Sequence, residues 1–129
     1  MTPDLTYLVY TAVLCLLLWV PYIVGVLRKY GGNADDYRDL PSHDLPPFLK
    51  RAYRAHINLV ENLPVFAVLV LVAHVADKAT AATATCAAVF FWARVAHAVV
   101  FWFGWPYVRT LAFAVSWFTL LYMAWQLLG

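Results

Sequence analysis

The chain of 129 residues is 64% hydrophobic and only 12% charged, whereas water-soluble domains average about 45–50% apolar and about 25% charged residues. This composition excludes a soluble globular domain and predicts an integral membrane protein. A net charge of +2 is too small to indicate a nucleic-acid partner.

Four stretches are apolar over the ~20 residues that a membrane-spanning helix requires. They predict helices at about 5–27, 47–76, 79–103 and 107–128. The second helix starts ahead of its apolar part because Pro46 and Pro47 suit a first helical turn. We expect residues 1–129 to form one domain of the all-α class, a transmembrane four-helix bundle. The first span has no basic segment before it and no cleavage site, so we expect it to be retained rather than removed as a signal peptide.

The second helix carries charged side chains into the membrane. At 100° per residue, four of its polar side chains fall within about 80° of one another and form one stripe: Arg51, Arg54, Asn58 and Glu61. His56 points to the opposite side of the helix. A charge in hydrocarbon is costly, so such a stripe indicates a functional site with a partner.

The distribution of Lys and Arg predicts the orientation in the membrane. The first connection is flanked by most of them: Arg28, Lys29, Arg38, Lys50, Arg51 and Arg54. Arg109 flanks the third connection, and Lys78 alone flanks the second. By the positive-inside rule, the first and third connections are cytoplasmic and both termini lie on the non-cytoplasmic side.

Arg94 and His97 share one face of the third predicted helix. Arg94 lies about 13 Å from the cytoplasmic end of that helix at 1.5 Å per residue, a depth at which it needs a carboxylate. Glu61 is the only acidic residue within a predicted span, and it lies on an antiparallel helix. We therefore predict an ion pair between Glu61 and Arg94.

Two main interpretations of this cluster remain open, and a third, a small transporter or channel subunit, is weaker because the charged side chains are confined to one half of the bilayer. In one, a non-enzymatic membrane protein uses the polar side chains only to hold helices and subunits together. A clamp needs only one pair, however, and further polar residues converge on the same half: Arg51, Arg54, Asn58, His97 and Arg109. They would form a cationic cavity suited to a small anionic ligand that also carries an ammonium group. We predict no metal site, because neither Cys15 and Cys86 nor His43 and Asp44 have the spacing of metal ligands.

The pattern R-A-x-x-N-x-x-E-x-x-P-x-F from Arg54 to Phe66, followed by R-V-A-H from Arg94 to His97, resembles the MAPEG family. These are membrane-associated proteins of eicosanoid and glutathione metabolism, and the likeness extends to the four-helix layout of a bacterial-type member. The resemblance implies a homotrimer in the bacterial inner membrane that binds glutathione, as co-substrate, between neighbouring subunits. The implied activity is that of a transferase or peroxidase acting on lipophilic small molecules that enter from the membrane lipid.

The resemblance also implies roles for single residues. Four of them match positions that contact glutathione in the family: Arg54, Asn58, Glu61 and Arg94. His97 occupies a position held by His or Tyr, and His56 occupies one that can contact glutathione from the adjacent subunit. We include Arg51 in the ligand-binding set. Arg109 matches the arginine that stabilises the thiolate. Lowering a thiol pKa of about 8.5 by ~2 units requires about 2.7 kcal/mol.

One position departs from the family pattern. Phe101 stands where the eicosanoid-metabolising members usually have Tyr, so a hydroxyl that would contact glutathione is missing. Either Tyr107 supplies the hydroxyl from the third connection, or glutathione binds weakly, or the chain uses another ligand.

Overall fold

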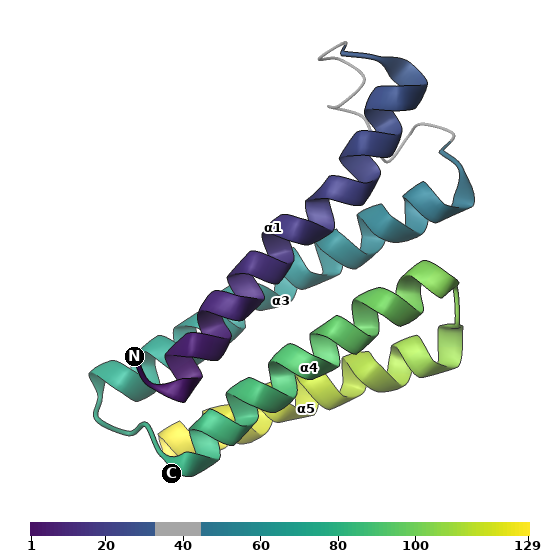
Figure 1. The fold of residues 1–129 in the computed structure, drawn as a ribbon. Coiled ribbons are helices and arrows are strands. Elements are labelled where there is room, and N and C mark those ends of the chain that lie inside the picture. Colours follow the sequence, from purple (N-terminus) through teal and green to yellow (C-terminus); the bar gives the residue numbers. More distant parts are fainter. Residues whose placement is uncertain (33–44) are drawn as a thin grey trace.

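The computed structural model describes residues 1–32 and 45–129. These residues form four helices: α1 (Pro3–Tyr30), α3 (Pro47–Val75), α4 (Ala81–Phe103) and α5 (Pro106–Leu128) (Figure 1). Each helix is long and apolar enough to cross a membrane. The prediction of an all-helical protein with four spanning segments is therefore confirmed. Arg38, His43 and Asp44 lie outside the described residues.

Proline, threonine and glycine set the helix ends. Pro3, Pro47 and Pro106 occupy first turns, where a backbone N–H would lack a helical acceptor in any case. Thr80 caps α4: its hydroxyl accepts from the Thr83 N–H, and the Thr83 hydroxyl accepts from the Thr80 N–H. This capping box starts α4 two residues later than the predicted position 79.

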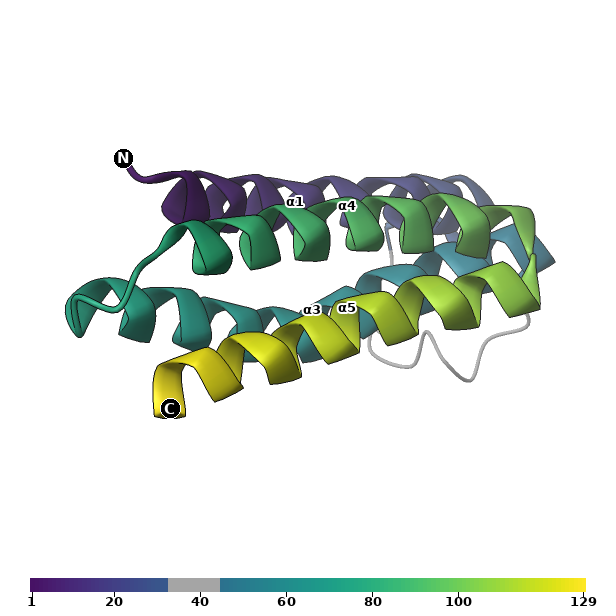
Figure 2. The ribbon, with the colours of Figure 1, turned by 90° about the horizontal axis from the view of Figure 1, so that it is seen from below.

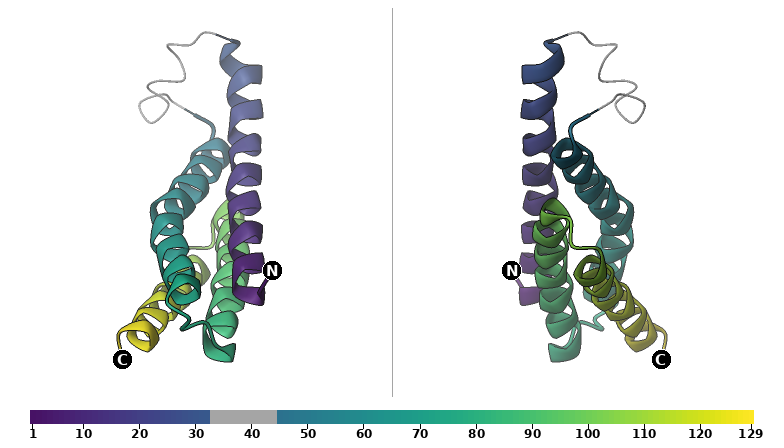
Figure 3. Two further views of the ribbon diagram at one scale, coloured as in Figure 1. Left: turned by 90° about the vertical axis from the view of Figure 1, so that its left-hand side faces the viewer. Right: turned by 90° about the vertical axis from the view of Figure 1, so that its right-hand side faces the viewer.

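Successive helices run antiparallel, so both termini and the α3–α4 connection lie at one end of the bundle (Figure 1). We call this the terminal end and the opposite one, where α4 turns into α5, the Gly104 end. Gly104 makes that turn with a left-handed φ of 76°, which costs glycine little. Figure 2 shows α1 beside α4 and α3 beside α5, and Figure 3 shows that α3 is inclined to α1. The largest contact is between α4 and α5.

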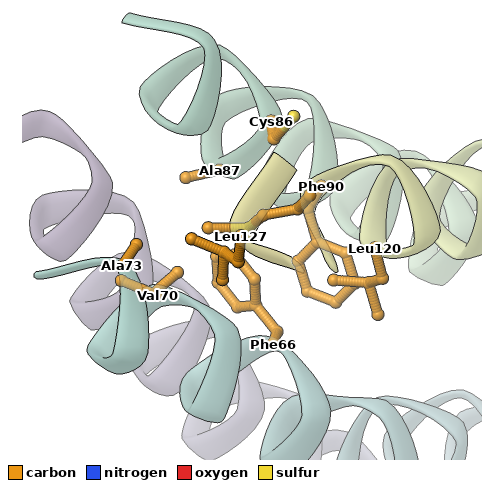
Figure 4. Packing of buried hydrophobic residues seen from close by; sticks show 9 residues of the cluster. Phe66, Val70, Ala73, Cys86, Ala87, Phe90, Leu120 and Leu127 are labelled. Atoms are coloured by element: carbon orange, nitrogen blue, oxygen red, sulfur yellow. The ribbon is translucent and has the colours of Figure 1, made fainter. Parts of the chain in front are cut away.

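The main apolar cluster lies toward the terminal end and joins α3, α4 and α5 (Figure 4). At its centre, the rings of Phe66 and Phe90 stack with centroids 4.2 Å apart, and both side chains are fully buried. Nearer the Gly104 end, α1 and α3 approach closely at Gly25. A Cβ added there would lie 2.3 Å from Leu49 Cδ2. These contacts fix the helices on either side of the polar residues described below.

Replacing Phe90 with Ala is expected to lower the free energy of unfolding by about 1–3 kcal/mol. This is less than the ~3–5 kcal/mol of soluble cores, because a ring released from a membrane protein meets lipid rather than water. Unfolding by sodium dodecyl sulfate in mixed micelles measures the change. Phe118→Ala is the matched control, because that ring is 63% exposed. Equal losses in the two variants would contradict the assignment of the Phe66–Phe90 stack to the core.

Candidate functional site

Polar and aromatic side chains meet along the contact between α4 and α5. Arg94, His97 and Phe101 lie one turn apart on α4, and the antiparallel α5 presents Ser116, Phe113 and Arg109 opposite them in that order. Arg94 Nη1 lies 3.5 Å from Ser116 Oγ. The ring centroids of His97 and Phe113 are 6.5 Å apart, and Arg109 Cζ lies 4.8 Å from the centroid of the Phe101 ring. We call these three pairs the α4–α5 ladder; the Arg94 pair is the deepest and the Arg109 pair lies at the Gly104 end.

Arg94 is the largest fully buried side chain, with 1% of its surface exposed. Its Nη2 donates a hydrogen bond of 2.5 Å to Asn58 Oδ1 on α3, and its contact with Ser116 is long. Within the described ranges, Arg94 Nε has no hydrogen-bond partner, and neither has Nδ1 of the adjacent buried His97. A buried cation that is bonded only to neutral groups remains poorly compensated. This position therefore favours an additional anionic or acceptor group.

The predicted ion pair between Glu61 and Arg94 is wrong for the single chain. Glu61 is exposed, and no described residue forms a hydrogen bond or ion pair with it. The two residues do lie at similar depth, as expected, but Asn58 occupies the place next to Arg94. Three helical positions turn Glu61 about 60° away from Asn58, toward the outside of α3. That rotation separates the carboxylate from the guanidinium.

Glu61 is nevertheless placed in the middle of its helix. It lies fourteen residues from either end of α3, about 21 Å at 1.5 Å per residue, and so well inside the membrane-spanning helix. Arg54, two turns nearer the Gly104 end on the same side of α3, is also exposed. Exposing a carboxylate to hydrocarbon at that depth is energetically costly. This side of α3 is therefore expected to face a polar group or another protein surface.

His56 has a partner within the chain. Its Nδ1 lies 3.0 Å from the hydroxyl oxygen of Tyr22 on α1, a hydrogen-bonding distance. Tyr22 is 4% exposed and packs edge-on against Tyr53, with ring centroids 5.3 Å apart. The opposite face of α3 is thus partly covered by α1, which sequence reasoning did not anticipate. The expected contact of His56 with a neighbouring subunit stays a prediction.

Arg51 connects α3 to the end of α4. Its Nε donates a hydrogen bond of 3.0 Å to the carbonyl oxygen of Trp102, one of the last carbonyls of α4, which lack helical donors. Its side chain also lies where a Cβ on Gly104 would meet it at 3.5 Å. Part of this guanidinium therefore serves to hold the Gly104 turn against α3.

The hydroxyl that Phe101 lacks is not replaced by Tyr107 within one chain. Tyr107 is 89% exposed, and none of the residues in 1–32 and 45–129 forms a hydrogen bond with it. Sequence reasoning missed Ser116 and Tyr22. Ser116 had a weak signal, because it follows Arg109 by seven positions and so lies on the same side of α5. No three His, Cys, Asp or Glu side chains of the described ranges come together as metal ligands.

The fold and the buried polar groups together define a helical integral membrane protein with a polar site inside the membrane-spanning part. A model of the MAPEG family matches residues 6–129, nearly the whole chain. The protein therefore belongs to the MAPEG family, and the resemblance inferred from its motifs is confirmed. No curated protein matches the sequence.

Replacing Asn58 with Ala is expected to destabilise the ligand-free protein by about 1–3 kcal/mol, because the buried guanidinium of Arg94 loses its shortest hydrogen bond. Adding Arg94→Met to this variant is expected to restore most of the loss, since two apolar partners leave no uncompensated charge. Unfolding in mixed micelles measures both variants. Asn62→Ala is the control, because among the described residues the Asn62 side chain bonds only to the backbone carbonyl of Asn58. Additive losses for Asn58→Ala and Arg94→Met would contradict a direct coupling between the two side chains.

Proposed function

We propose that this protein is a glutathione-dependent transferase or peroxidase that acts on lipophilic electrophiles in the membrane. The observation that carries the proposal is the buried Arg94, whose guanidinium has neutral partners in Asn58 and Ser116 and an Nε without one among the described residues. The site thus favours an anion at a depth where water is scarce. Members of the family are commonly glutathione-dependent transferases or peroxidases, which agrees with this demand.

Glutathione carries two carboxylates, one ammonium group and one thiol, and the site has a complement for each. Arg94, with Asn58 and His97 beside it, would bind a carboxylate. Arg54 would bind the other carboxylate, and Glu61 the ammonium group. Arg109 lies in the first turn of α5, where the helix dipole also favours an anion. This end of the ladder would hold the thiolate.

The proposed chemistry needs the thiol to lose its proton. The thiolate sulfur then attacks an electrophilic carbon and displaces a leaving group such as halide. With a lipid hydroperoxide the thiolate attacks the terminal oxygen, the O–O bond breaks, and the alkoxide takes up a proton and leaves as the alcohol. The sulfenic acid formed on the first glutathione then reacts with a second glutathione to give the disulfide and water. The guanidinium of Arg109 stabilises the sulfur charge before attack. Binding close to hydrocarbon would bring the sulfur to substrates that are dissolved in lipid.

The exposed charged side of α3 supports a site that is completed by another copy of the chain. Glu61, in the middle of α3, and Arg54, two turns nearer the Gly104 end, lie on the surface of the single chain, where lipid would surround them at a cost. A neighbouring subunit would cover them and could bring its own His56 to the ligand. We therefore propose a homotrimer in the bacterial inner membrane, with the Gly104 end facing the cytoplasm and both termini on the other side.

The first test of this proposal measures turnover and glutathione binding in detergent. The wild-type protein is expected to conjugate a generic aryl halide or to reduce a lipid hydroperoxide, and to show a thermal shift with glutathione.

Arg109→Met is expected to lower kcat about 10²- to 10³-fold, as does removal of one preorganised stabilising donor. Arg94→Met is expected to raise the Kd for glutathione about 10- to 100-fold, since it removes a charged hydrogen-bond donor.

Arg28→Met serves as the control, because Arg28 is exposed in the last turn of α1. Arg94→Met and Glu61→Gln proteins that stay folded and retain full glutathione binding would overturn the site assignment. A wild-type protein without turnover and without a thermal shift would favour the alternative, in which the polar cluster serves only helix and subunit packing.

A second test addresses the subunit arrangement. Native mass spectrometry in detergent is expected to show three copies of the chain. Arg94→Met and His56→Ala chains, each expected to have reduced activity alone at low glutathione concentration, should regain part of the activity when co-expressed, because mixed trimers contain sites with both side chains intact. A monomer, or mixed assemblies without any recovery, would contradict a site shared between subunits.

A further inference from the structure

Phe101 is the position at which the chain departs from the expected pattern, and its ring has two neighbours in the α4–α5 ladder. The guanidinium carbon of Arg109 lies 4.8 Å from the ring centroid. The His97 ring lies edge-on to it, with centroids 5.4 Å apart and an interplanar angle of 68°. Phe101 itself is 8% exposed. The ring of Phe101 thus contacts both His97 and Arg109, the two polar side chains of the ladder nearest the Gly104 end.

Arg109 needs such a neighbour because its own helix does not stabilise it. It is the fourth residue of α5, so its positive charge lies near the positive end of the helix dipole. No described residue accepts a hydrogen bond from its side chain or forms an ion pair with it. The face of an aromatic ring attracts a guanidinium within about 6 Å, and the attraction grows when water is excluded. Among the described residues, Phe101 is the contact that can fix the position of this guanidinium.

We propose that Phe101 is a positioning residue for Arg109, which holds the guanidinium over its ring and so directs it toward the sulfur of bound glutathione. This inference rests on the proposed function and deepens it. In this chain the ring face of Phe101 holds the guanidinium of Arg109 in one position. A hydroxyl at this position would instead contact glutathione itself. Phe101 acts only through Arg109 and is not a catalytic residue.

The experiment compares Phe101→Leu, which keeps an apolar side chain without a ring, with Phe101→Tyr, which keeps the ring. The ultraviolet absorbance of the glutathione thiolate in the complex is followed against pH, together with kcat and KM. Phe101→Leu is expected to lower kcat between about 2-fold and 30-fold, the range set by one cation–π contact. Its thiolate absorbance should appear at higher pH, with the KM for glutathione nearly unchanged. Phe101→Tyr should behave like the wild type in the pH midpoint.

Two comparisons separate positioning from packing. Phe103→Leu is the matched control, because that ring lies on the same helix but is 66% exposed and stacks on Trp105. In an Arg109→Met background, Phe101→Leu should cause no further loss of kcat, since the residue through which it acts is gone. An unchanged pH midpoint in Phe101→Leu, or additive losses in the double variant, would overturn the inference while leaving the proposed function intact. A wild-type protein that gives no thiolate absorbance overturns both.

Discussion

A guanidinium that is buried within the membrane-spanning part of the bundle, with neutral groups as its partners, is the constraint on which the site depends. Arg94 of α4 is buried, with Ser116 of α5 beside it, and its short hydrogen bond to Asn58 Oδ1 ties α4 to α3. An amide oxygen reduces the cost of burying the cation without cancelling its charge. The arrangement can therefore hold the bundle together and still attract an anionic ligand. A full ion pair with Glu61 would also hold the helices together, but it would neutralise the charge that attracts an anionic ligand.

The antiparallel packing of α4 on α5 converts sequence spacing into depth. Arg94 and Phe101 are seven residues apart on α4, as are Arg109 and Ser116 on α5, and seven residues are close to two helical turns. Each helix therefore presents its pair on one side, and the reversed direction sets Arg94 against Ser116 and Phe101 against Arg109. The two cations end up at opposite ends of the ladder, with His97 between them. This separation would let one cation bind a carboxylate and leave the other for the sulfur.

Hydrophobic runs, proline positions and the motifs on the second and third helices were sufficient to predict four helices and to identify the family. They also placed Glu61 and Arg94 at the same depth, because rise per residue is uniform along a helix. What they could not supply is the rotation of each helix about its axis. Asn58 and Glu61 belong to one stripe on a helical wheel, and only the packing of α3 on α4 decides that Asn58 meets Arg94. For the same reason the helical wheel could place His56 opposite the polar stripe but could not show that α1 covers part of that side through Tyr22. Ser116 and Phe101 acquire their roles from neighbours on another helix, which a single-helix pattern does not contain.

The exposed side of α3 gives the remaining step. Arg54 and Glu61 lie on the surface of one chain while Arg94, His97 and Phe101 are buried beneath it, so the polar region passes from the interior of the bundle to its outside near the middle of the membrane. In lipid, the exposed charges of Arg54 and Glu61 need to be covered by a polar surface. Toward the terminal end, however, the same side of α3 is apolar and consists of Val65, Val68 and Val72, which a charged surface would not suit. A surface that is apolar at one end and polar at the other meets both conditions. Under the proposed function, one chain would build only half of the site, and the ligand that neutralises Arg94 would lie at the boundary between the two halves.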